Sequence, residues 1–188
     1  MKGTRRCRWA ETDTLVREYH DTEWGVPVHD DSKLFEFLIL EGAQAGLNWL
    51  IILKKRNAFR VAFEGFEPSK IAKYTSADIK KLLANTEIIR NRLKISAAVT
   101  NARQVLSIQE EFGSFNDYLW RFVGYRPIKH EFRYPSSIPA RTKESDRMSE
   151  SLRERGFKFV GSTICYAFMQ AVGMVNDHTT HCFRYSEV

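Results

Sequence analysis

The sequence is poor in the residues that mark secreted or membrane-bound chains. It has three cysteines in 188 residues, too few for a disulfide framework, so we expect a reducing compartment and place the chain in the cytoplasm. The longest nearly apolar run, Val160 to Val175, is interrupted by small and polar residues and predicts a buried helix rather than a membrane span. The basic start, Met1 to Cys7, is followed by no apolar stretch, which argues against a secretory signal or a lipid anchor.

Repeats, low-complexity tracts and long linkers are also missing, so we expect a single domain over residues 1–188. Only five prolines occur, and two of them exclude a helix from segment 134–139. We find no convincing pair of alternating strands. The expected fold is therefore all-α, with about nine or ten short helices.

Helix start and stop signals divide the chain. Asp30 to Ser32 can cap a helix, and helical apolar spacing continues to Phe63 with a break between Gly42 and Asn48. Further start signals are Pro68, Thr75 and Ser114, and the expected stops are Gly156 and Gly173.

The charge balance is basic, with 29 Lys and Arg against 23 Asp and Glu and a net charge of +6. Such a balance favours polyanions but does not by itself separate nucleic-acid binding from a solvated surface. Asp78 to Ala84 forms one helix, residues 85–87 a tight connection, and residues 88–95 lead into a second helix. This hairpin could turn backbone N–H groups toward a phosphate, with Arg90, Arg92 and Lys94 adding charge. An ordinary helix pair with a solvated basic face fits the same residues.

Four residues form a candidate metal site. Cys7 and His20 lie near one end of the sequence, and His178 and Cys182 lie near the other with i, i+4 spacing, which would place both on one helical turn. Two thiolates and two imidazoles suit a closed, structural zinc site. The alternatives are unpaired cysteines with surface histidines, or replacement of a ligand by His181 or His29. Cys165 is expected to be a packed apolar thiol.

Glu41 follows apolar residues and precedes a run of small ones, which predicts a carboxylate at the margin of an apolar cavity near Trp49. Together with aromatic rings it could accept hydrogen bonds from a cationic nucleobase. A salt bridge with Lys54 or Arg56 is the other interpretation.

Taken together, several segments resemble one family, the bacterial 3-methyladenine DNA glycosylases of type I in the helix-hairpin-helix superfamily. The matching segments are residues 7–9, 19–27, 40–49, 88–92, 155–166 and 175–178. The resemblance implies an all-α helix-hairpin-helix fold, one structural zinc held by Cys7, His20, His178 and Cys182, and hydrolysis of the N-glycosidic bond of 3-methyladenine in double-stranded DNA. No base that activates water is evident.

The resemblance also assigns residues. Glu41 would be the catalytic and base-binding carboxylate, surrounded by Trp9, Tyr19 and Trp49. As a hypothesis, Gln44 or Leu47 fills the gap that the extruded base leaves in the duplex. The chain departs from the commoner family pattern at Arg8, Val16, Glu87 and Leu93.

The rival functions are a zinc-stabilised DNA-binding module without catalysis and a zinc-dependent hydrolase. The first has no use for a recessed carboxylate among tryptophans, and the second needs an open position on the metal. We expect a monomer that does not associate with membranes.

Overall fold

The computed structural model describes residues 4–188, and most of them are helical. Residues 1–3, which begin the segment examined above for a targeting signal, lie outside the described residues. The α-helices are α1 (Thr14–Thr22), α2 (Asp31–Gln44), α3 (Trp49–Ala62), α4 (Pro68–Ile71), α5 (Ser76–Ala84), α6 (Arg92–Phe112), α7 (Phe115–Trp120), α8 (Lys143–Glu154) and α9 (Ser162–Ala171). No helix within residues 4–188 is long and apolar enough to cross a membrane.

The all-α expectation needs one small correction. Two-residue strands β1 (Ile128–Lys129) and β2 (Val175–Asn176) pair in parallel, with Ile128 opposite Val175. A strand of two residues is too short for an alternating pattern to appear in the sequence. The helices are mostly short, as expected, but α6 has 21 residues.

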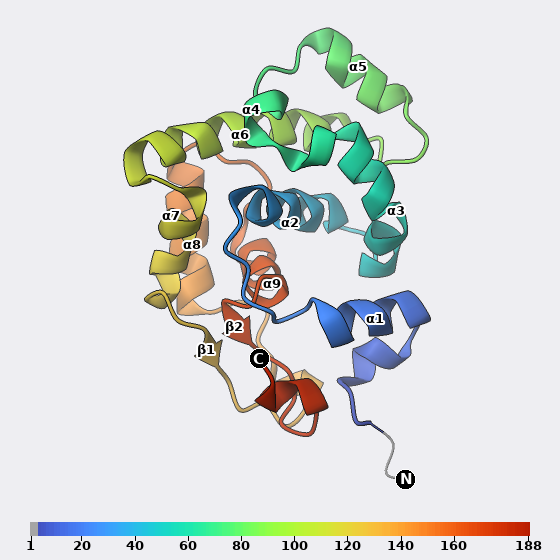
Figure 1. The fold of residues 1–188 in the computed structure, drawn as a ribbon, viewed down its shortest axis with the longest axis vertical. Helices are drawn as coiled ribbons and strands as arrows, with labels where there is room; N and C mark the ends of the chain where they lie inside the picture. The colour runs from blue at the N-terminus through green and yellow to red at the C-terminus, as the bar shows by residue number, and fades with distance from the viewer. Residues whose placement is uncertain (1–3) are drawn as a thin grey trace.

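Helix α2 occupies the centre of the molecule, between α6 and α9 (Figure 1). Every residue from Leu34 to Ala43 is buried, as the apolar side chains on all faces of this helix require. Gly42 allows Phe159, in the segment before α9, to approach α2 closely. A Cβ at Gly42 would lie 3.2 Å from the Cβ of Phe159.

The structure confirms the main start and stop signals. Asp30 caps α2 by accepting a hydrogen bond from the Lys33 N–H at 2.8 Å, and Thr75 forms a capping box with Asp78. The expected break separates α2 from α3. The glycine stops are confirmed where the chain leaves α8 and α9, because Gly156 and Gly173 have φ angles of 88° and 71°.

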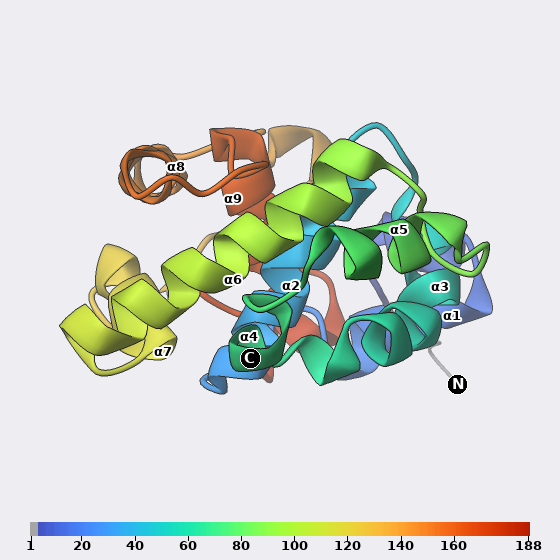
Figure 2. The ribbon, with the colours of Figure 1, turned by 90° about the horizontal axis from the view of Figure 1, so that it is seen from above.

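The predicted helix pair is present, with a longer connection than expected. Helix α5 begins at Ser76 and α6 at Arg92, so residues 88–91 are not helical. We call residues 85–91 the hairpin segment. Seen from above, α6 runs across the molecule from the hairpin segment to α7 (Figure 2).

Candidate functional site

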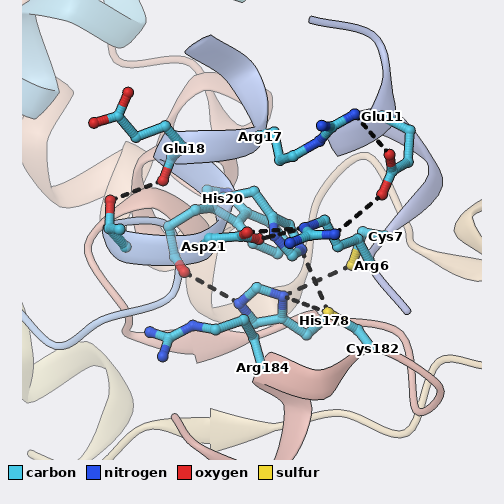
Figure 3. Close-up of polar contacts among 12 residues, drawn as sticks. Arg6, Cys7, Glu11, Arg17, Glu18, His20, Asp21, His178, Cys182 and Arg184 are labelled. Atoms are coloured by element: carbon cyan, nitrogen blue, oxygen red, sulfur yellow. Dashed lines mark hydrogen bonds and ion pairs between the residues drawn. The ribbon is translucent and has the colours of Figure 1, made fainter. Parts of the chain in front are cut away.

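Four buried side chains from segments far apart in sequence meet at one point. Cys7 precedes a short 3₁₀ turn, His20 belongs to α1, and His178 and Cys182 follow β2. The candidate ligand atoms of these four residues all lie within 4.8 Å of one another. Figure 3 shows the His178 ring facing both sulfur atoms. These are the four residues that the sequence suggested as ligands, and together they could hold a metal ion.

The distances within this Cys/His cluster suit a tetrahedral ion. The Cys182 Sγ lies 3.4 Å from the His20 Nε2 and 3.5 Å from the His178 Nδ1, and the Cys7 Sγ lies 3.7 Å from the same Nδ1. Ligand bonds of about 2.0–2.3 Å in a tetrahedron place ligand atoms about 3.3–3.8 Å apart. The donor set and these three distances are therefore compatible with a tetrahedral metal ion.

Each histidine is oriented by its other ring nitrogen. The Nδ1 of His20 lies 2.7 Å from the carboxylate of Asp21, which also accepts a hydrogen bond from Arg6 at 2.8 Å. The Nε2 of His178 lies 3.1 Å from the carbonyl oxygen of Trp24. Such partners fix the ring orientation and leave the opposite nitrogen free to bind a metal.

The local structure at the second pair corrects the sequence analysis. His178 and Cys182 do not lie on a helical turn; the Cys182 N–H donates to the Thr179 carbonyl at 2.8 Å in an irregular segment. The replacement ligands are not used, since His181 is exposed and His29 contacts Asn116. Cys165 is buried away from the cluster, as expected for a packed thiol.

The thiols of the cluster influence each other. Hydrogen bonding with Cys182 raises the pKa of Cys7, and the same interaction lowers the pKa of Cys182. A cation bound at this site would favour the thiolate form of both cysteines.

A cavity of about 450 Å³ lies beside the cluster and contains Glu41. This volume is within the range of small-molecule sites. Its lining comes from α1 and the turn before it, from α2, α3 and α9, and from the proline-containing segment 135–140. The lining residues are Trp9, Tyr19, Trp24, Glu41, Gln44, Trp49, Pro135, Ile138, Pro139, Ala140, Thr163, Tyr166, Ala167 and Gln170.

Glu41 is the one residue with a carboxylate among these lining residues, and only 5% of it is exposed. Within residues 4–188 its carboxyl group has no hydrogen-bond partner. Burial raises its pKa to about 8, so the protonated form of the carboxyl is favoured at neutral pH. The alternative salt bridge is not formed, because Arg56 donates to Glu23 at 2.9 Å and to Glu36 at 2.8 Å.

Aromatic side chains connect the cavity wall to the cluster. The Trp9 ring packs edge-on against Trp24 at 4.9 Å and against His20 at 5.1 Å between centroids. Across the cavity lining, Tyr19 and Trp49 are tilted by 50° with centroids 5.5 Å apart. The Nε1 of Trp49 is buried without a partner in the described chain. The cavity lining thus combines aromatic rings with one carboxyl group.

Sequence reasoning missed the α9 side of the cavity. Tyr166 and Gln170 line it, and both donate to the same oxygen of the fully buried Asp177, at 2.5 and 2.7 Å. The other oxygen of Asp177 lies 2.6 Å from the Nδ1 of His130. The sequence signal that could have indicated this part of the cavity was the presence of polar residues inside the apolar run 160–175.

The residues expected to contact DNA lie at two places. Gln44 is the last residue of α2, and Leu47 lies in the connection between α2 and α3, where it is 37% exposed. Arg90 and Arg92 are exposed at the hairpin segment and the start of α6, whereas Lys94 is partly buried. Of the departures from the family pattern, Glu87, Leu93 and Arg8 are exposed and Val16 is buried.

Comparisons with known proteins agree on one family. The family model described as methyladenine glycosylase matches residues 9–185. The chain is 47% identical over 180 residues to DNA-3-methyladenine glycosylase 1 of Escherichia coli (strain K12), covering 96% of both chains. It is 45% identical over 179 residues to DNA-3-methyladenine glycosylase of Haemophilus influenzae, covering 95% of this chain and 97% of that one.

A crystal structure of 3-methyladenine DNA glycosylase I superposes with a TM-score of 0.93 at 49% identity, covering 95% of this chain and 98% of that chain. The match extends over nearly the whole sequence. The chain therefore belongs to the methyladenine glycosylase family.

Proposed function

We propose that this protein hydrolyses the N-glycosidic bond of 3-methyladenine in alkylated double-stranded DNA, releasing the free base and leaving an abasic site. The buried, unpaired carboxyl of Glu41 in an aromatic cavity is the observation that carries this proposal. The family membership supports it, because the named relatives are 3-methyladenine glycosylases.

The chemistry of the damaged base explains why one carboxyl suffices. The methylated adenine carries a positive charge in DNA, so the electron pair of the C1′–N9 bond goes to the base, which leaves neutral. Water then bonds to C1′ and its proton passes to solvent. The chain has to extrude the nucleotide, select it, and stabilise the developing sugar cation.

Glu41 discriminates by charge. A cationic base favours the ionised carboxyl, which then accepts hydrogen bonds from the base, while the faces of Tyr19 and Trp49 also attract positive charge. Neutral adenine carries no positive charge to favour the ionised form, so Glu41 gains no charge–charge attraction from it. Catalysis and selection thus use the same residue.

The Cys/His cluster is proposed to hold one structural zinc ion through Cys7, His20, His178 and Cys182. Four protein ligands close the coordination shell, so the ion supplies folding free energy and no activated water. It stabilises the segment on which Trp9 and Tyr19 lie.

DNA binding is assigned to two segments. The hairpin segment and the start of α6 would bind phosphates as a helix-hairpin-helix motif, with Arg90 and Arg92 exposed there. Leu47, assisted by Gln44, would fill the gap in the duplex. The protein is proposed to act as a monomer in the cytoplasm.

The decisive experiment identifies by chromatography the base that is released from methylated duplex DNA. We expect free 3-methyladenine, with Glu41→Gln reducing release by about 100-fold. Glu18→Gln, at an exposed position of α1, is the matched control and should retain full activity. If no 3-methyladenine is released above the buffer control, the proposed activity is wrong and a zinc-stabilised DNA-binding module becomes the better interpretation.

A further inference from the structure

Lys94 connects α6 to the end of α2. It is the third residue of α6, and its Nζ donates to the carbonyl oxygens of Ala43 at 2.7 Å and Ala45 at 2.6 Å. The last carbonyls of a helix lack partners within the helix and lie at its negative end. An ammonium group is therefore well suited to this position.

These two carbonyls flank the start of the α2–α3 turn, which we define as residues 45–48. Gly46 has a φ of 81°, a conformation that favours glycine. The Gln44 Nε2 donates to the Leu47 carbonyl at 3.0 Å, and the Asn48 side chain caps α3 by accepting from Leu50 N–H at 2.8 Å. The turn is thus held at both ends while Leu47 projects from it.

The same lysine is fixed on the hairpin side. Its backbone N–H donates to the Asn91 side chain at 3.1 Å, next to the exposed Arg90 and Arg92. Burial lowers the pKa of the Lys94 ammonium, which agrees with a group drawn from solvent onto carbonyl oxygens. Lys94 therefore spans the two places that the proposed function assigns to DNA contact.

We propose that Lys94 is a positioning residue, which fixes Leu47 at the correct distance from the phosphate-binding hairpin segment, and that it does not bind phosphate itself. This inference rests on the proposed glycosylase function. A shift of Leu47 relative to the hairpin segment would prevent full insertion into the duplex, and small misplacements of this kind are costly to rate.

The test compares Lys94→Met, which keeps the aliphatic stem but cannot donate, with two other variants. Arg92→Met removes a proposed phosphate contact, and Lys70→Met removes an exposed charge on α4. The first readout is the salt dependence of affinity for a duplex that contains a stable abasic analogue. The second is the fluorescence of a 2-aminopurine placed beside that analogue, which reports insertion into the stack. The third is the rate of 3-methyladenine release.

We expect Lys94→Met to keep the wild-type salt dependence, to lose most of the 2-aminopurine response at saturating protein, and to release base about 10- to 100-fold more slowly. Arg92→Met should flatten the slope of log affinity against log salt by about one. Lys70→Met should match the wild type in all three.

A slope for Lys94→Met that flattens as it does for Arg92→Met, or an unchanged fluorescence response, overturns the inference. Because the first two readouts need no turnover, they decide the role of Lys94 even if wild-type protein releases no base, a result that would instead end the proposed function. If Lys94→Met melts more than about 10 °C below wild type, Lys94→Gln is judged by the same readouts.

Discussion

The hydroxyl of Tyr166 donates a 2.5 Å hydrogen bond to the buried carboxylate of Asp177. Tyr166 lines the cavity, and Asp177 precedes the cluster residue His178 in sequence. One hydrogen bond thus connects the wall that would contact the base to the segment that would hold the metal.

Tyr166→Phe should lower the free energy of unfolding by about 1.5–3 kcal/mol, because a hydrogen bond to a charged group is lost and Asp177 stays buried. Urea denaturation measures this change. Tyr125→Phe, at a tyrosine that is 60% exposed, is the control, and it should change the free energy of unfolding by less than about 0.5 kcal/mol. Equal losses in the two variants would contradict a charged partner.

Glu41→Gln should make stability less dependent on pH. Burial raises the Glu41 pKa from 4.5 to about 8, so the folded chain retains a proton that the unfolded chain releases. The contribution of Glu41 to the free energy of unfolding is fully present below about pH 4.5. It decreases as the pH rises toward 8 and is then lost. The full loss is on the order of 5 kcal/mol, because each pH unit between the two pKa values corresponds to about 1.4 kcal/mol.

The glutamine variant cannot ionise, so it should resemble wild type at pH 5 and be the more stable protein at pH 9. Thermal unfolding at both pH values checks this. Glu18→Gln should show no such crossover, because Glu18 is exposed. If the difference in stability between wild type and Glu41→Gln is the same at pH 5 and pH 9, the pKa of Glu41 lies near its ordinary value.

Cys182→Ser should remove the metal from the cluster. We expect metal content to fall from about one ion per chain to near zero, and unfolding free energy to fall by roughly 3 kcal/mol or more. Elemental analysis of metal-replete protein provides the measurement. Cys165→Ser alters a buried thiol outside the cluster and should retain the ion. Full metal content in Cys182→Ser would show that Cys182 is not a ligand.

Leu47→Ala should slow base release from duplex DNA by about 10- to 100-fold, because it removes most of the apolar surface that would be buried in the gap. Release from single-stranded DNA should change little, since no gap has to be filled. The comparison is made with Val61→Ala, which truncates an 82% exposed side chain at the other end of α3. A uniform loss on both substrates would point away from insertion.

Local signals in the sequence were sufficient for the helices. Caps such as Asp30 and Thr75 act over three or four residues, so the sequence specifies them directly. The four cluster residues could be grouped because cysteine and histidine are common metal ligands and because the family resemblance implied this set. The i, i+4 spacing of His178 and Cys182 fits a tight turn as well as a helix, which is why their local conformation was predicted wrongly.

Features that depend on long-range packing could not be predicted. Asp177 receives donors from Tyr166, Gln170 and His130, and no pattern in the sequence associates them. The contact of Lys94 with Ala43 and Ala45 involves backbone oxygens, which every residue has. Similarly, the raised pKa of Glu41 follows from its burial and not from its neighbours in sequence.

The raised pKa of Glu41 has a consequence for how the cavity would treat healthy and damaged bases. A carboxylate buried there without a partner carries an unfavourable desolvation cost. Holding the group mostly protonated avoids that cost. A cationic base favours the ionised form, so under the proposed function the negative charge develops mainly together with the positive charge that it binds.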